Sequence, residues 1–393
     1  HHAVMGDTWG LETPLWFAPS KEEAHDVLSF HRSNDFEHVG NEVRGVRNSV
    51  GVTEVSNFAK YQVSGEGAES WLSHLMCNTM PKTGRIMLTP MLNDNGKLIG
   101  DFTIGKLDED AFMMWGSLGA SRYHMRWFMD HLPEDDSVQV HRFDMDLMGL
   151  SIAGPNARKV LAKLCDEDVS NEAFRFMDIR EMDVNGAPCI VNRVTYSGDL
   201  GYEIWMEPVY QRKVYDGIKE AGAEFDIVDF GMRALLSMRL EKNFPSWFAE
   251  MRPIYGPYDA SMDRFIKLSK NDFIGQEAAS REFSDGPKLR RVSFVIEADN
   301  ADVMGDEPIW AKVGEKGYDT IEPPHGYGAV RFQACGKEVP KSVPHIDGEW
   351  RCAPNKFGTG SRLDKNGNPV KNGMIGEIVV TNLSRHHMPI IRF

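Results

Sequence analysis

The residues of this chain best suited to chemistry are two carboxylates and an aromatic ring carried by two turns. Residues 196–203 read Tyr-Ser-Gly-Asp-Leu-Gly-Tyr-Glu and lie between two extended segments. Two glycines that can take positive φ predict a β-hairpin corner here, which would present Tyr196 and Glu203 together. The Asn-Asp-Asn-Gly at 93–96 predicts a second hairpin, with Asp101 at the start of its return strand.

An aromatic ring beside a carboxylate suits the binding of a flat heterocycle with amide-like groups. The Glu203 carboxylate could accept hydrogen bonds from two adjacent N–H donors, and the Tyr196 ring could pack on the face of the ligand. Two other interpretations stay open. Tyr196 and Glu203 could form a surface cross-strand pair, and Asp101 could cap its turn, because Asp readily accepts hydrogen bonds from nearby backbone N–H groups.

Alternating strands and helices must position these turns. Apolar residues at helical spacing predict helices at residues 21–36, 68–76, 121–132, 157–164 and 210–222. Alternating or continuous apolar patterns predict strands within residues 43–63, 84–104, 111–117 and 147–153. Two successive strand-helix-strand modules result.

Composition restricts the class of protein. With 393 residues, 41% hydrophobic and 26% charged, the chain is expected to be a soluble globular protein of two or three domains. A net charge of -14 opposes binding to nucleic acid or to anionic lipid, and no run of about 18 apolar residues predicts a membrane span. Neither nucleic acid nor a membrane is therefore expected as a partner.

Cysteine and histidine usage argues against a disulfide framework and against a metal site. The 5 cysteines are widely spaced without a CxxC arrangement, and the 13 histidines show no metal-ligand spacing. Reduced thiols point to a cytoplasm or a mitochondrial matrix, and we predict a cytoplasmic location.

Further motifs follow the two turns in a characteristic order. They are Gly154-Pro-Asn-Ala-Arg158, Arg233-Ala-Leu-Leu-Ser-Met-Arg239-Leu-Glu-Lys242, Tyr255-Gly-Pro-Tyr258 and Asp272-Phe-Ile-Gly-Gln-Glu277. Together these segments resemble the aminomethyltransferase family, which includes the glycine-cleavage T-protein and the folate-binding C-terminal half of dimethylglycine and sarcosine dehydrogenases. The resemblance covers residues 13–351.

The resemblance implies an α+β fold, a three-domain cloverleaf with a C-terminal β-barrel-like domain. Residues 12–57 together with 145–265 would form folate-binding domain 1, and residues 58–144 would form domain 2. Residues 285–393 would form the C-terminal β domain, without assigned closing strands after residue 351.

The resemblance also implies a cofactor, a reaction and a set of site residues. Tetrahydrofolate would be bound by Tyr196, Glu203, Arg239 and Tyr258, and Asp101 would be catalytic, handling the exchanged proton. The reaction would be methyl or methylene transfer from a small N-, S- or O-methylated donor, a transferase or demethylase activity. Without the resemblance, Arg239 could equally belong to a solvated helix face.

Two departures from the family restrict what can be inherited. The dehydrogenases carry a flavin domain before this half, whereas this sequence has no GxGxxG after an N-terminal strand. It is therefore either a free-standing transferase or the excised folate half of a flavin-dependent dehydrogenase, and a flavoprotein partner or domain is expected in the second case. Residues 363–392 instead resemble a segment of adenylate-forming acyl-CoA ligases, which indicates a fused or substituted tail with a strand at 376–383.

A non-catalytic folate-binding protein of the same fold is a further alternative. The iron–sulfur assembly relatives of this fold carry a cysteine in the segment that corresponds to residues 270–277. Here that segment reads Lys-Asn-Asp-Phe-Ile-Gly-Gln-Glu and has no cysteine. The missing thiol argues against this alternative. A damaged or chimeric reading frame that folds poorly because of its tail is a third one.

Overall fold

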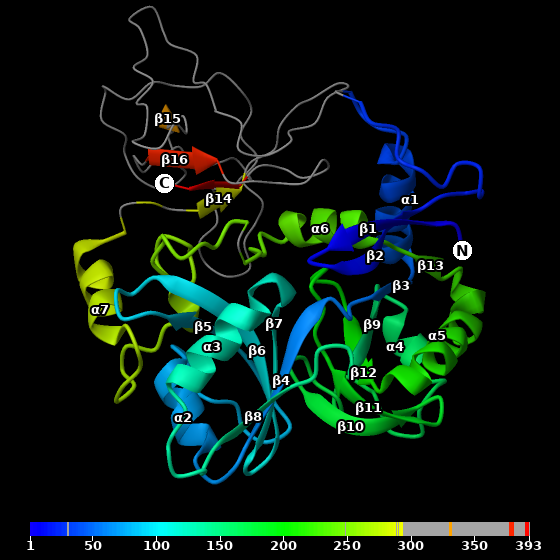
Figure 1. The fold of residues 1–393 in the computed structure, drawn as a ribbon. Helices are drawn as coiled ribbons and strands as arrows, with labels where there is room; N and C mark the ends of the chain where they lie inside the picture. The colour runs from blue at the N-terminus through cyan, green and yellow to red at the C-terminus, as the bar shows by residue number, and fades with distance from the viewer. Residues whose placement is uncertain are drawn as a thin grey trace, which may run out of the picture.

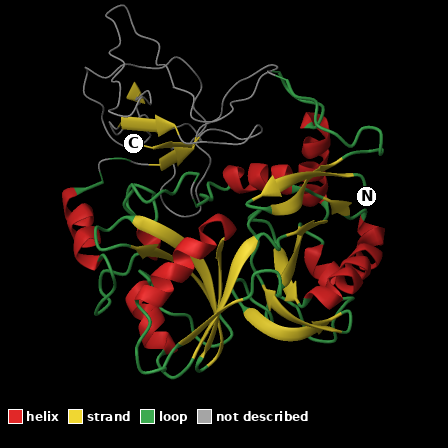
Figure 2. Ribbon diagram, viewed as in Figure 1, coloured by secondary structure: helices red, strands yellow, loops and turns green. Residues whose placement is uncertain are grey.

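Two β-sheets stand side by side and form most of the structure (Figure 1). The computed structural model describes residues 1–29, 31–247, 249–287, 289 and 291–293, together with the strands at 330–331, 377–380 and 390–392. Helices cover the outer faces of the two sheets, so that their inner faces are turned toward each other (Figure 2). Between those inner faces lies a core cluster that joins Met113 and Trp115 of one sheet to Trp205 of the other.

The six-stranded sheet carries the Glu203 hairpin. Its strands in spatial order are β10 (Ile179–Val184), β11 (Ala187–Asn192), β12 (Gly201–Met206), β9 (Met148–Ala153), β3 (Gly51–Glu54) and β13 (Val228–Asp229). Helices α4 (Ala157–Leu161) and α5 (Pro208–Gly222) cover its outer face. Tyr202, Ile204 and Met206 pack into the outer core. Because side chains alternate along a strand, Glu203 and Trp205 must point to the inner face.

The five-stranded sheet carries the Asp101 hairpin. Its strands in spatial order are β5 (Ile86–Leu92), β6 (Leu98–Asp108), β7 (Ala111–Ser117), β4 (Phe58–Ser64) and β8 (Gln139–Arg142). Helices α2 (Ala68–Leu75) and α3 (Ser121–Asp130) lie on its outer side. Phe102 and Ile104 pack into the core on that side, so Asp101 and Thr103 point to the inner face.

The remaining elements close the structure above the sheets in the view of Figure 1 and at its edge. They are the hairpin β1 (Ala3–Thr8) and β2 (Leu11–Phe17) and the helices α1 (Phe36–Asn48), α6 (Met232–Glu241) and α7 (Gln276–Asp285). A fourth sheet has the order β14 (Arg291–Ser293), β17 (Ile390–Arg392), β16 (Glu377–Val380) and β15 (Val330–Arg331). Strand β16 lies where the tail was expected to form a strand. None of the described helices combines the length and the apolar character that a bilayer crossing requires.

Two expectations about local structure were wrong. The described residues 21–29 and 31–35 form no helix: Leu28 is 75% exposed, and Asp26 and Asp35 bind Arg233 of α6 instead of continuing a helical stripe. Residues 43–48 belong to helix α1 and not to a strand, because the valines at 39, 43 and 46 recur at helical spacing against α6 and β2. The helix predicted at residues 210–222 is confirmed as α5, which ends at Gly222.

The fold class was predicted correctly, in that the structure is α+β. The division into domains stays a prediction. The strands of the six-stranded sheet come from residues 12–57 and 145–265, and those of the five-stranded sheet come from 58–144. The expected β-barrel-like domain at 285–393, including the tail, lies largely outside the described residues.

Candidate functional site

Glu203 lies in the middle of β12 with its carboxyl almost completely buried, at 8% exposure. Burial raises the pKa of Glu203 to about 8, although the amide of Asn192, opposite on β11, lowers it. That amide forms no hydrogen bond of normal geometry with any described residue. A carboxyl and an amide therefore stand side by side on the inner face with unused hydrogen-bonding capacity. The expectation of a surface pair is wrong for Glu203.

Two glycines shape this hairpin in different ways. Gly198 has φ +72°, as the predicted corner requires. Gly201 is not in a left-handed conformation: it begins β12, and a Cβ there would lie 2.1 Å from the carbonyl oxygen of Ile152. Gly201 is thus required by the close approach of β12 to β9, which sets the position of Glu203.

Aromatic rings fill the junction around Tyr196. The ring of Phe58, at the start of β4, makes edge contacts with Tyr196 and with Trp205, each with centroids 6.4 Å apart. Trp205 in turn packs against Trp115 of β7, with centroids 5.6 Å apart. The indole N–H groups of both tryptophans are buried without a hydrogen-bond partner in the described structure. These four rings are called the aromatic junction below.

Asp101 reaches the junction from the five-stranded sheet. Burial raises the pKa of Asp101 to about 7, and no described Lys or Arg pairs with it. Its charge helps to raise the pKa of Tyr196 to about 12, after burial and the charge of Glu250. The charge of Asp101 on β6 is therefore felt by Tyr196, which lies in the loop before β12.

Arg239 is buried on α6 and is held by an ion pair. Its Nη1 lies 2.9 Å from Oε1 of Glu250, with side-chain exposures of 3% and 0%, and the same nitrogen donates to the carbonyl oxygen of Phe244 at 3.0 Å. Burial lowers the pKa of Arg239, but Glu250 and Tyr196 raise it above its ordinary value. The interpretation as a solvated helix face is wrong: Nη1 is held inside the protein, and Nε is buried without a hydrogen-bond partner among the described residues.

Tyr258 lies in a different part of the core. It is 3% exposed, and its ring centroid is 5.5 Å from that of Phe283 on α7. It belongs to the core of the five-stranded sheet and not to the aromatic junction. Tyr196 is thus electrostatically coupled to Asp101 and to Arg239, and Glu203 lies on the inner face of the six-stranded sheet. The binding role of Tyr258 stays a prediction.

Sequence reasoning did not identify several residues of this region. Trp205 could have been found, because it lies two positions after Glu203 on the same strand and so shares its face. Glu250 lies in an irregular stretch without periodicity, and nothing in the sequence marks it as the partner of Arg239. In the part of the chain that the structure describes, no group of three or more His, Cys, Asp or Glu is placed to hold a metal ion.

Comparisons with known proteins support the resemblance. The family model described as "GCVT N-terminal domain" matches residues 1–270. The chain is 34% identical over 310 residues to dimethylglycine dehydrogenase of Mus musculus, covering 78% of this chain and 36% of that protein. It is 29% identical over 262 residues to an aminomethyltransferase of Thermoanaerobacter sp. strain X514, covering 66% of this chain and 70% of that protein.

A solved structure of aminomethyltransferase T from the glycine cleavage system of Bartonella henselae has a similar fold. Its TM-score is 0.66 at 18% identity, with 100% of this chain and 85% of that chain covered. At this identity the similarity concerns the fold alone. By contrast, the chain spans only about a third of the length of the dimethylglycine dehydrogenases that it matches, 36% in each of the three mammalian proteins.

Proposed function

The chain belongs to the aminomethyltransferase-type family defined by the GCVT N-terminal domain, and from that premise we propose that it is a tetrahydrofolate-dependent one-carbon transferase. The donor would be a small N-, S- or O-methylated compound. One observation carries this proposal: the buried carboxyl of Glu203 and the half-buried carboxyl of Asp101, both with raised pKa values, lie on the inner faces of opposite sheets without a described cation partner. Ionisable groups with strongly perturbed pKa values gather at functional sites.

The residues present fit the cofactor. Tetrahydrofolate carries adjacent N–H donors on its flat ring, which the Glu203 carboxyl could accept, and Asn192 offers an unused amide beside it. The Tyr196 ring would pack on the ring face. When bound, the cofactor supplies a nitrogen that accepts the one-carbon unit. Arg239 would act mainly through Tyr196 and the segment that follows α6, because Glu250 already holds its guanidinium.

Asp101 is the residue suited to proton transfer. Since burial raises its pKa to about 7, the carboxyl exchanges a proton readily near neutral pH, which is the condition for an efficient general acid or base. Its neighbour Tyr196 stays protonated there, because burial and nearby carboxylates raise its pKa to about 12. Asp101 would thus hold or release a proton at a carboxyl oxygen while the aromatic junction excludes water.

Titration calorimetry with reduced tetrahydrofolate under anaerobic conditions tests the binding site. The intact protein should bind saturably, Glu203→Gln should weaken binding, and Asp101→Asn should reduce turnover far more than affinity. Glu220→Gln, an exposed position on α5, is the matched control and should change neither property. Equal loss of affinity and turnover in both site variants would contradict this division of roles.

A second candidate is the folate half of a larger demethylating dehydrogenase. The match to 36% of dimethylglycine dehydrogenase favours it, because the remaining length of that protein has no counterpart in this chain. Turnover of a methyl donor without an added flavoprotein would support the free-standing transferase. Turnover only with a flavoprotein partner would support the second candidate, and folate binding without turnover in either assay would indicate a non-catalytic binding protein.

A further inference from the structure

A concave site lies apart from the candidate folate-binding residues, where β10 meets the turn before β5. The cavity has a volume of about 540 Å³, within the usual range for small-molecule sites, and Arg85 and Asp178 contribute to its lining from the two different sheets. Backbone hydrogen bonds join the sheets beside it, from Ile86 N to Met177 O at 2.8 Å and from Ile179 N to Gly84 O at 3.0 Å. Its lining includes none of the proposed folate-binding residues.

The lining is strongly cationic in a chain that is acidic as a whole. Lys82, Arg85, Arg175 and Arg180 contribute positive charge and Asp178 is the single carboxylate, which leaves an excess of three positive charges. The net charge of the whole chain is -14. A local reversal of sign inside a concavity concentrates the electrostatic potential and attracts anions. We call this site the cationic cavity.

The Asp178 carboxylate anchors one side of the cavity. Its side chain is 8% exposed; one oxygen forms an ion pair with Arg85, and the other accepts a hydrogen bond from the Arg175 backbone N–H at 2.6 Å. The Arg175 guanidinium is 67% exposed, and its Nε lies 3.9 Å from the same carboxylate. One buried carboxylate thus lies within ion-pair distance of two arginines, and its single negative charge cannot neutralise both.

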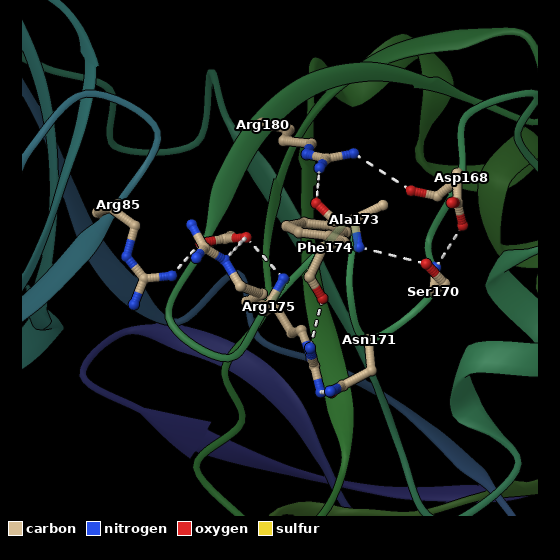
Figure 3. Close-up of polar contacts among 10 residues, drawn as sticks. Arg85, Asp168, Ser170, Asn171, Ala173, Phe174, Arg175 and Arg180 are labelled. Carbon is tan, nitrogen blue, oxygen red and sulfur yellow. Dashed lines mark hydrogen bonds and ion pairs between the residues drawn. The ribbon is translucent and has the colours of Figure 1, made fainter.

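The other cations of the cavity have no carboxylate of their own. Arg180 donates to the carbonyl oxygens of Asp168 and Ala173 and lies over the Phe174 ring, 4.6 Å from its centroid (Figure 3). The Asp168 carboxylate instead accepts a hydrogen bond at Oδ1 from the Ser170 backbone N–H, at 2.7 Å. The Lys82 side chain is exposed, and its ammonium group has no hydrogen-bond or ion-pair partner among the described residues. Arg180 is therefore held in position, and its charge and that of Lys82 stay available.

We propose that the cationic cavity binds a small polyanion that carries two or more phosphate or carboxylate groups. Guanidinium groups match both kinds of oxyanion with paired N–H donors, and a fixed guanidinium loses little side-chain entropy on binding. The ligand would contact residues next to both sheets. Its binding would therefore stabilise the arrangement of the two sheets and increase the free energy of unfolding. This inference does not depend on folate binding or on catalysis.

Calorimetry with inorganic pyrophosphate and with citrate, at low ionic strength and without folate, tests the cavity and distinguishes the two oxyanion chemistries. At least one probe should bind saturably and raise the thermal unfolding temperature. In the double variant Lys82→Gln/Arg175→Gln the dissociation constant should rise about tenfold or more, which corresponds to about 1.4 kcal/mol. Neither side chain is buried, so this variant should fold.

The double variant Arg212→Gln/Arg281→Gln is the matched control. It removes the same net charge from exposed helical positions elsewhere, each of which takes part in a surface ion pair with a residue four positions away. Its affinity for either probe should stay within about twofold of the unmodified protein. Absence of saturable binding by both probes, or equal weakening in the two double variants, would overturn the proposal.

Discussion

Two neighbouring regions of the molecule contain ionisable groups with little exposure to solvent. In one region they form an ion pair, and in the other they have no described ion-pair partner. Beside α6, Arg239 and Glu250 neutralise each other at 2.9 Å. At the inner faces of the sheets, the half-buried Asp101 and the buried Glu203 have no described cation partner, and their pKa values rise to about 7 and about 8. A paired buried charge contributes to a unique structure, whereas an unpaired one costs stability. The difference suggests that the first region is structural and the second is reserved for a ligand.

Glu250→Gln should produce the largest loss of stability. The substitution leaves the Arg239 guanidinium buried without its carboxylate, and breaking a buried pair from one side typically costs about 3–5 kcal/mol. Urea denaturation at neutral pH measures this loss. Arg212 on α5 provides a control, because Arg212→Gln breaks only an exposed pair and should cost less than about 0.5 kcal/mol. If Glu250→Gln lost no more stability than Arg212→Gln, the Arg239–Glu250 pair would have no structural importance.

The sequence predicted the second region better than the first, and the reason is physical. The two-residue period of strands locates Glu203 and Asp101, since each lies on a regular strand, and turn chemistry locates Tyr196 in the loop between β11 and β12. The partner of Arg239 comes from an irregular segment, and its position depends on tertiary packing that leaves no periodic signal. For the same reason the helix predicted at residues 21–36 was wrong: buried ion pairs with Arg233 outweigh a weak amphipathic pattern.

Gly201→Ala should be the next most damaging change. An added Cβ would lie 2.1 Å from Ile152 O and 2.9 Å from Ala153 Cα, and backbone atoms of a central strand cannot move aside cheaply. We expect a loss of about 3 kcal/mol in urea denaturation. Because β12 would shift away from β9, Glu203 should also become less buried and folate affinity should fall.

Gly40→Ala is the matched control for this substitution. Gly40 lies inside α1, and the nearest atom to an added Cβ is the end of the flexible Arg44 side chain, at 3.3 Å. Alanine favours a helix interior over glycine by about 0.5–1 kcal/mol, so this variant should be slightly stabilised. Equal losses in both variants would mean that the close approach of β12 to β9 is not what Gly201 provides.

Glu203→Gln should remove a pH-dependent loss of folding stability. Burial raises the pKa of Glu203 from 4.5 to about 8, so between these values the unfolded chain releases a proton that the folded protein retains. The contribution of Glu203 to stability is therefore greatest below pH 4.5 and is lost as the pH rises toward 8. The variant should gain roughly 3 to 4 kcal/mol relative to the unmodified protein between about pH 5 and pH 8. Urea denaturation across that range measures this difference, and parallel pH profiles of the two proteins would contradict it.

Tyr196→Phe should have the smallest effect on stability. Because Tyr196 lies between the Arg239–Glu250 pair and the inner faces of the sheets, this variant tests to which of the two regions its hydroxyl belongs. The substitution removes the hydroxyl that donates to Pro245 O at 2.8 Å but keeps the ring against Phe58. A buried hydrogen bond of this kind contributes about 1 kcal/mol, so urea denaturation should show a loss of that size. If the ring alone contacts the cofactor, tetrahydrofolate affinity should change less than about threefold, since the stacking surface is unchanged. A tenfold loss of affinity with unchanged stability would instead make the hydroxyl a direct ligand and place its role in the cofactor site, not in the structural region beside α6.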